Sequence, residues 1–407
     1  MVHPVPFLGH VLVFPDIQII TEHRFQKSFF YTTAYSIHSF RIILIWRQIS
    51  TSVLKAFKQK QITKNTCSIQ ILAQSVKQYG SFHQALSHYF SEDSVIANIE
   101  KNTMGKSLNN VPQAPLDVQF NSNGMKCSAY LYRPATEVAT PMIVMAHGLG
   151  GTRRMRLTAF AERFVAEGYA CLVFDYRYFG DSEGQPRQLL DIKSQLEDWK
   201  AAIAYARSLD KIDPNRVVIW GTSFGGGHVL ATAADDNRLA AVISQCPFTD
   251  GFSSSMAMDP ITTLKLTGLA LKDKIGSMLS AKPVMVPLAA PSGHTALMNA
   301  PDAYSGYLAL MPSGSNIPNY VAARFVLDII RYYPGRKTSR IQAPVLFCVC
   351  DTDSVAPSKT TLRHASHTPN HEIKHYADGH FEIYVGEAFE RVVRDQIDFL
   401  KRIVPVK

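Results

Sequence analysis

A serine near the middle of the chain lies in a pattern that is typical of a catalytic nucleophile. Residues 221–225 read Gly-Thr-Ser-Phe-Gly, so a glycine stands two positions before and two positions after Ser223. An apolar run at 217–220 predicts a strand before the motif, and small residues predict a helix after it. Such a sharp strand-to-helix turn holds the serine in a strained backbone conformation and needs small neighbours. The pattern therefore predicts that Ser223 attacks a carbonyl carbon.

A second glycine-rich loop can stabilise the charge that this attack creates. Residues 147–151 read His-Gly-Leu-Gly-Gly and follow an apolar run at 142–146 that predicts a buried strand. Acyl transfer needs two backbone N–H groups aimed at the developing oxyanion. We expect Phe224, directly after the serine, to supply one N–H group and Leu149 the other. His147 precedes the loop, and we expect it to brace the loop rather than to act as a base.

The base that activates the serine is expected near the carboxyl end of the chain. Residues 378–381 read Asp-Gly-His-Phe and follow a strand predicted at 372–376. Gly379 permits a tight turn there, from which His380 can reach over the edge of the sheet. His375 lies in or beside the strand itself, so we expect it to be structural.

Two aspartates follow the preceding predicted strand, at 345–349, and either one can orient the base. They are Asp351 and Asp353. A carboxylate that accepts a hydrogen bond from one imidazole nitrogen leaves the other nitrogen free to take the serine proton. The residues alone leave the choice between the two aspartates open.

The elements that must position these residues alternate regularly from about residue 112 onward. A hairpin is predicted around Asn123-Gly124, and Thr152 is expected to cap a helix that ends near residue 167. Strands and helices then alternate, which implies a mostly parallel sheet with helices on both faces. Residues 251–340 interrupt the alternation and are rich in Leu, Ala, Met and Pro. So long an insertion predicts a helical cap, with helices near 262–279 and 321–332.

The order of these features resembles that of the α/β-hydrolase superfamily, over about residues 115–405. The resemblance is carried by a strand, a His-Gly loop, the G-x-S-x-G motif, an acid and a final histidine, in that order. Residues 175–182 also resemble the superfamily's D-x-R-G-x-G-x-S turn, with Tyr178 in place of a glycine. The resemblance implies an eight-stranded, mostly parallel sheet and a structural role for Asp175 and Asp181.

More loosely, the chain is similar to the Xaa-Pro peptidase-like and dienelactone hydrolase-like branches and to hydrolases of secondary-metabolite pathways. Many dienelactone hydrolase-like proteins have a cysteine nucleophile, and the serine at position 223 differs from them in this respect.

The resemblance also implies which aspartate is the acid. Members of the superfamily often carry G-x-x-D-x-x-x-P, and Asp353 with Pro357 matches its second half, although Cys350 stands where glycine is usual. We therefore expect Asp353, rather than Asp351, to complete a catalytic triad with the serine and the histidine. Asp250 is a third candidate, because some members place the acid after an earlier strand.

Charge separates a basic amino-terminal part from a nearly neutral remainder. Residues 1–110 contain 11 Lys and Arg against 5 Asp and Glu, whereas residues 111–407 contain 31 against 28. The net charge of +9 is therefore no argument for a nucleic-acid partner. We expect residues 1–110 to be a poorly defined extension, with helices at 53–60 and 69–90. Residues 111–407 should form the hydrolase domain, with its cap at about 251–340. Contact of the extension with a membrane is the less favoured alternative.

Cysteine usage and motifs indicate the compartment and the need for a cofactor. Four of the six cysteines lie in or beside predicted buried strands, and no C-x-x-C pair occurs. We therefore expect reduced thiols and a cytoplasmic protein. The glycines at 221–227 lack the lysine of a phosphate-binding loop. We expect neither a metal nor another cofactor.

Three functions are compatible with these residues. The first is a serine hydrolase that cleaves a carboxylic ester or thioester through an acyl-enzyme on Ser223, with an apolar acyl part that suits the apolar cap. The second is an acyltransferase or cyclising enzyme of polyketide or other secondary metabolism that uses the same triad. The third, which an intact triad disfavours, is a non-catalytic binding protein on this scaffold. The expected partner is a small-molecule acyl substrate, and the natural substrate and the oligomeric state stay open.

Overall fold

The structure is a computed structural model that describes residues 10–14, 17–21 and 114–406. The chain divides into two compact units, Met1–Asn102 and Thr103–Lys407. In the first unit, β1 (His10–Phe14) and β2 (Ile17–Thr21) pair as an antiparallel hairpin, which the sequence analysis did not predict. The helices expected at 53–60 and 69–90, and the expected boundary at residue 110, lie outside the described residues.

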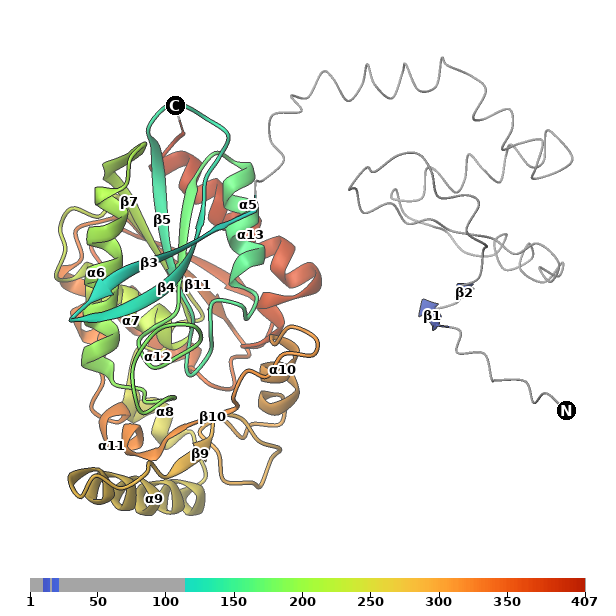
Figure 1. Ribbon diagram of the computed structural model, residues 1–407, viewed down its shortest axis with the longest axis vertical. Helices are drawn as coiled ribbons and strands as arrows, with labels where there is room; N and C mark the ends of the chain where they lie inside the picture. Colours follow the sequence, from blue (N-terminus) through green and yellow to red (C-terminus); the bar gives the residue numbers. More distant parts are fainter. Residues whose placement is uncertain (1–9, 15–16, 22–113, 407) are drawn as a thin grey trace, which may run out of the picture. The chain divides into compact units, whose positions relative to one another are not determined.

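The second unit is built around one eight-stranded sheet with the strand order β12-β11-β8-β7-β5-β6-β4-β3 (Figure 1). β4 is antiparallel to both β3 and β6, and all other neighbouring strands are parallel. The mostly parallel eight-stranded sheet that we predicted is confirmed. The strands are β3 (Leu116–Ser122), β4 (Met125–Tyr132), β5 (Thr140–Ala146), β6 (Ala170–Phe174), β7 (Ile212–Thr222), β8 (Ala241–Gln245), β11 (Val345–Cys350) and β12 (His371–Tyr376).

The apolar runs in the sequence correspond to strands that are covered on both faces. Every residue of β5, β6, β8 and β11 is buried, as expected for the inner strands of a parallel sheet. The hairpin of β3 and β4 turns at Asn123 and Gly124, whose φ angles of 50° and 84° are the pair that a two-residue turn of this type requires.

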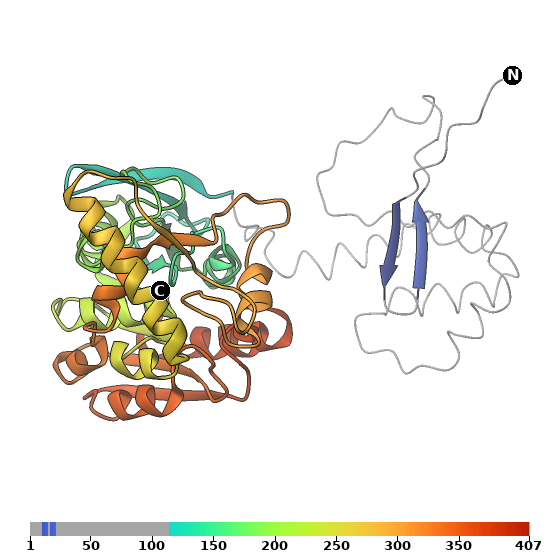
Figure 2. The same cartoon turned by 90° about the horizontal axis from the view of Figure 1, so that it is seen from below.

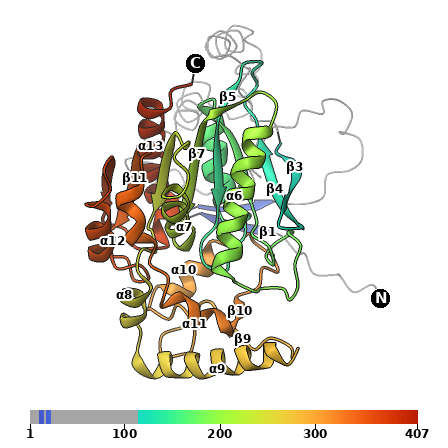
Figure 3. The same ribbon diagram turned by 90° about the vertical axis from the view of Figure 1, so that its left-hand side faces the viewer.

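Helices cover both faces of the sheet. α5 (Leu157–Ala166) and α13 (Gly386–Ile403) lie on one face, and α6 (Ile192–Ser208), α7 (Phe224–Ala233) and α12 (Ser358–Ala365) lie on the other (Figures 1 and 3). The prediction for Thr152 was wrong. α5 begins only at Leu157, after Arg156 in a left-handed conformation, because the preceding residues form a turn that is fixed to the sheet through Arg153.

The segment between β8 and β11 forms the cap. α9 begins at Pro260, where the Asp259 carboxylate accepts hydrogen bonds from two backbone amides, and so confirms the helix expected near 262–279. The helix expected at 321–332 is present only in part, because β10 (Tyr320–Ala322) pairs with β9 (Met285–Pro287) and the helical turns that follow cover residues 323–329. The cap elements are α8 (Gly251–Met256), α9 (Pro260–Met278), β9, α10 (Ala303–Ala309), β10, the 3-10 helix η4 (Ala323–Phe325), α11 (Val326–Ile329) and the 3-10 helix η5 (Pro334–Arg340).

The cap lies beyond one end of the sheet, and Figure 2, seen from below, shows α9 lying across its outer surface. None of the helices within the described part of the chain combines the length and the apolar character needed to cross a membrane.

Candidate active site

Ser223 lies at the turn between β7 and α7. Its backbone has φ of 56° and ψ of −120°, a combination that L residues adopt only where their surroundings impose it. Two glycines make room for the turn. A Cβ atom on Gly221 would collide with the backbone of Gly225, and a Cβ atom on Gly225 would lie 2.5 Å from the carbonyl oxygen of His147. The close packing of these loops explains why the motif needs both glycines.

His380 faces Ser223 from the loop after β12. The serine hydroxyl Oγ lies 2.9 Å from Nε2 of the imidazole, and the histidine is only 1% exposed. The loop is fixed by its own turn, in which the backbone N–H of Gly379 donates a hydrogen bond to the Glu382 carboxylate. The structure therefore brings the predicted nucleophile and the predicted base within hydrogen-bond distance of each other.

Asp353 completes a chain of three side chains. Its Oδ2 lies 2.7 Å from Nδ1 of His380, and both side chains are 2% exposed. Its Oδ1 accepts hydrogen bonds from the backbone N–H groups of Val355 (2.8 Å) and Ala356 (2.6 Å). Because each carboxylate oxygen has its own partners, the acid is fixed in the orientation that a catalytic imidazole needs.

The other candidate acids lie apart from this chain. Asp351 contacts Nδ1 of His375 at 2.8 Å, and this second His–Asp pair is about half exposed, with side-chain exposures of 47% and 51%. Asp250 caps α8 by accepting a hydrogen bond from the Ser253 backbone N–H. Of the three aspartates, only Asp353 contacts the histidine that faces the serine.

The pKa of His380 is raised. Burial opposes protonation of the imidazole, but the Asp353 carboxylate and the Cys246 sulfur together stabilise the charged form more strongly, and raise the pKa of His380 to about 9. A base must be neutral to accept a proton, so the active form of His380 grows as the pH rises toward this value.

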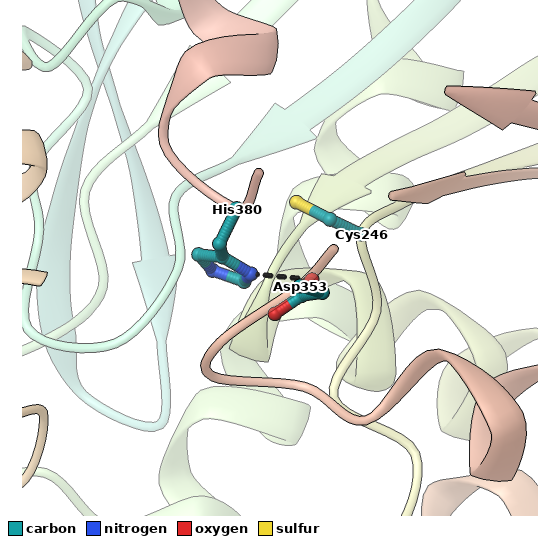
Figure 4. A group of neighbouring side chains, drawn as sticks. All are labelled: Cys246, Asp353 and His380. Atoms are coloured by element: carbon teal, nitrogen blue, oxygen red, sulfur yellow. Dashed lines mark hydrogen bonds and ion pairs between the residues drawn. The ribbon is translucent and has the colours of Figure 1, made fainter. Parts of the chain in front are cut away.

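Cys246 belongs to the site, although the sequence analysis did not select it. Figure 4 shows its sulfur beside the His380–Asp353 pair, and ligand atoms of the three residues lie within 4.8 Å of one another. Burial alone would raise the pKa of the thiol, but the side chain of Cys350 and the charge of His380 lower it to about 7. The signal that could have found it is topological, because β8 and β11 are neighbouring parallel strands whose carboxyl ends meet.

The same three residues are the group of potential metal ligands found in the described part of the chain. His380 and Asp353 are already hydrogen bonded to each other, and His380 is also in contact with Ser223. This arrangement favours proton transfer over metal binding.

The loop after β5 passes directly over the serine. A Cβ atom on Gly148 would lie 2.8 Å from the Cβ of Ser223 and 3.2 Å from its Oγ. Leu149 follows in this loop, and Phe224 follows Ser223 at the first position of α7, where N–H groups are free to bind an anion. The backbone positions expected to supply an oxyanion hole therefore flank the serine hydroxyl.

His147 braces this loop, as we expected. It is 1% exposed, and its Nδ1–H donates a hydrogen bond to the Gly148 carbonyl oxygen at 2.9 Å. The imidazole packs edge-to-face against Tyr176, at 4.7 Å between ring centroids, and burial lowers its pKa. These contacts hold the ring in the wall of the site, where it makes no hydrogen bond to Ser223.

The turn after β6 supports the same loop from behind. The Asp175 carboxylate accepts a hydrogen bond from the Arg153 backbone N–H at 2.6 Å and also pairs with the Arg153 guanidinium. Asp181 pairs with this guanidinium at 2.8 Å. Tyr178, which stands where the superfamily usually has glycine, keeps the positive φ of that position, 72°. Both aspartates thus make structural contacts, as the resemblance implied.

A narrow pocket of about 30 Å³ lies over the serine and the histidine. It has room for about two water molecules. Much of the lining is apolar and comes both from the hydrolase core and from the cap. The core contributes Leu149, Met155 and Leu157, and the cap contributes Met298, Tyr307 and Leu310.

Comparisons with known proteins show the family of the chain. The family model for X-Pro dipeptidyl-peptidases (S15 family) matches residues 123–269. The quorum-quenching protein AidA of Acinetobacter baumannii (strain MDR-ZJ06) is 97% identical over 304 residues, which is 75% of this chain and all of the relative. The thiohydrolase aneE of Aspergillus aculeatus is 27% identical over 302 residues, covering 72% of this chain and 94% of the relative.

A solved structure shares the fold. The crystal structure of the α/β-hydrolase GrgF from Penicillium sp. sh18 superimposes with a TM-score of 0.61 at 24% identity, and covers 72% of this chain and 99% of its own. The chain therefore belongs to the α/β-hydrolase superfamily, in the family that contains the quorum-quenching protein AidA. It is an enzyme of this superfamily, and its relatives include a thiohydrolase and a polyketide transferase.

Proposed function

We propose that the enzyme hydrolyses a carboxylic ester or thioester through an acyl-enzyme on Ser223. The observation that carries this proposal is the buried chain of hydrogen bonds from Ser223 through His380 to Asp353, with distances of 2.9 and 2.7 Å. This chain has the connectivity by which an imidazole activates a serine hydroxyl.

In the first half-reaction, Ser223 Oγ forms a bond to the carbonyl carbon while its proton moves to Nε2 of His380. The tetrahedral intermediate then breaks the carbon–oxygen or carbon–sulfur bond, and the leaving group takes the proton from Nε2. In the second half-reaction, water attacks the acyl-enzyme, gives a proton to His380 and releases the carboxylic acid, and the proton returns to Ser223. The Asp353 carboxylate stabilises the imidazolium in both halves.

The developing oxyanion would be held by the backbone N–H groups of Leu149 and Phe224. The positions of Gly148 over Ser223 and of Phe224 at the start of α7 support this assignment. Two such donors in a site with little water are worth several kcal/mol of barrier, since removing one typically costs about 3–4 kcal/mol.

The pocket and the relatives support a proposal for the substrate class. The apolar side chains of Met155, Leu157, Met298 and Leu310 suit an apolar acyl part. The nearly identical relative is named for quorum quenching. Acylated lactones are among the signals used in bacterial quorum sensing, and a lactone is a cyclic carboxylic ester that the same steps would open. We therefore propose an acylated ester of this kind as the substrate.

Acyl transfer is the second candidate, and the relatives supply the observation that favours it. The polyketide transferase grgF from Penicillium is 25% identical over 301 residues. In a transferase, an alcohol or amine would take the place of water in the second half-reaction. Product analysis separates the two functions, because only a transferase forms a product in proportion to the added acceptor.

The proposal is tested by labelling the full-length protein with a fluorophosphonate probe, wild type beside Ser223→Ala. We expect the wild type alone to be labelled and to hydrolyse p-nitrophenyl esters. Equal labelling of both proteins, or none in demonstrably folded protein, would contradict the assignment of Ser223.

The compartment is part of the same proposal. Five cysteines among the described residues are free and buried, which supports a reducing, cytoplasmic environment.

A further inference from the structure

The pocket over Ser223 contains a polar group that the proposed mechanism does not use. Tyr307 of α10 lines the pocket together with Ser223 and His380 and is only 4% exposed. Its hydroxyl group has no hydrogen-bond partner among the residues that the structure describes. Burying a hydroxyl without a hydrogen-bond partner costs about 1–3 kcal/mol of folding free energy. A ligand that binds in the pocket and pairs with this hydroxyl would recover that free energy.

Contacts on both sides hold α10 against the catalytic loops. At its start, the Asp302 carboxylate accepts a hydrogen bond from Ser354 at 3.0 Å, next to the acid of the triad. In its middle, Gly306 packs so tightly that a Cβ atom there would lie 2.5 Å from the Cβ of Phe381, next to the base. Tyr307 follows Gly306, so its place in the pocket is set by the loops that carry Asp353 and His380.

The hydroxyl of Tyr307 is suited to donate a hydrogen bond. Burial raises the pKa of this phenol, so it keeps its proton throughout the working range of pH. One other pocket residue has an unpartnered polar atom, Nε2 of His147, but that ring is fixed to its own loop and packs against Tyr176. Among the cap residues that line the pocket, Tyr307 is therefore the one that carries an unpartnered donor within the described part of the chain.

We propose that Tyr307 binds a hydrogen-bond acceptor in the substrate, such as a keto or amide oxygen, and so selects acyl esters that carry one over purely apolar esters of the same length. This inference rests on the proposed function and names its substrate class. A site that pairs a buried hydroxyl with a substrate oxygen rejects the analogue that lacks this oxygen, because the hydroxyl is then left unpaired.

The test uses three p-nitrophenyl esters of matched length, the pentanoate, the 4-oxopentanoate and the N-acetylglycinate, with the full-length enzyme. We expect the wild type to favour at least one of the two acceptor esters over the pentanoate by about tenfold in kcat/KM. Tyr307→Phe should remove this preference, by raising KM for the favoured acceptor ester more than KM for the pentanoate. Tyr304→Phe is the matched control, because Tyr304 lies one turn earlier on α10 and is 38% exposed.

Two results would overturn the inference. One is an equal loss on all three esters in Tyr307→Phe, which would mean that the hydroxyl only supports the fold. The other is a wild type without preference for either acceptor ester. A failure of the proposed function would give a different result, because fluorophosphonate labelling would then be absent or would persist in Ser223→Ala. The two results that overturn the inference on Tyr307 leave the labelling of Ser223 intact.

Discussion

Two His–Asp pairs lie near the carboxyl ends of the same two strands, and only one of them faces Ser223. His380 and Asp353 are 2.7 Å apart, and His375 and Asp351 are 2.8 Å apart, so the two hydrogen bonds are nearly the same length. The first pair is 2% exposed on both sides, whereas the second is about half exposed. The comparison teaches that the hydrogen bond between the residues does not define the site. Burial and contact with the serine define it.

Burial also changes the strength of the two pairs. Charges in water interact weakly and are screened by salt. The charges of a buried pair interact strongly, and removing one partner destabilises the protein because the other charge is left buried and unpaired. The neighbourhood differs in the same way, since the buried pair has the Cys246 sulfur beside it. The two pairs can therefore be compared residue by residue.

The largest difference is expected between the two histidines. His380→Ala should lower kcat by about 10⁴–10⁶, because the serine then has no base. His375→Ala should stay within about twofold of wild type. Initial rates on a p-nitrophenyl ester measure both. A large loss in His375→Ala would mean that the exposed pair takes part in catalysis.

The two aspartates should differ next. Asp353→Asn should lower kcat by about 10³–10⁴, because the amide does not stabilise the imidazolium or fix its tautomer. Asp351→Asn serves as the matched control and should leave kcat unchanged. If Asp351→Asn had the larger effect, the assignment of the acid would be reversed.

The two pairs should also differ in their contribution to the free energy of unfolding, although by less than they differ in catalysis. Asp353→Ala leaves a buried imidazole and two backbone N–H groups without their partner, and should lower the free energy of unfolding by about 3 kcal/mol. Asp351→Ala removes an exposed pair and should cost less than about 1 kcal/mol. Urea unfolding followed by circular dichroism checks both values, and equal losses would contradict the comparison.

The pH profile gives the finest test of the buried pair. The neutral form of His380 is the base, so kcat/KM should fall as the pH drops below about 9. Cys246 helps to raise the pKa of His380, so Cys246→Ser should shift the midpoint of the profile to lower pH while the exposed His375→Ala variant keeps the wild-type midpoint. An unchanged midpoint in Cys246→Ser would show that the sulfur carries no charge that His380 senses.

Local patterns predicted most of the fold and the positions of the serine and the histidine. The glycines around Ser223 could be recognised as a motif from the sequence, because the backbone there leaves no room for a Cβ atom and this constraint is local. The alternation of strands and helices could be predicted, because strands that are buried on both faces of the sheet appear in the sequence as continuous apolar runs. The choice of Asp353 needed the family resemblance, since Asp351 has the same chemistry two residues away.

Features that depend on distant contacts were missed or were wrong. Cys246 joins the site through the neighbouring ends of β8 and β11, which no local pattern encodes. The helix expected at 321–332 begins only at residue 323, because pairing with β9 imposes an extended backbone on residues 320–322. Thr152 has the composition of a helix cap, but tertiary contacts of Arg153 fix that turn instead.

The close approach of Gly225 to His147 has a consequence for how this enzyme can diverge. Because a methyl group at position 225 would strike the carbonyl oxygen of His147, the turn that carries the nucleophile and the loop that should bind the oxyanion cannot shift independently. A variant with new specificity must therefore keep both of them and change what the cap presents. We expect mutations that broaden the substrate range to accumulate in the cap segment between β8 and β11, while these two loops stay constant.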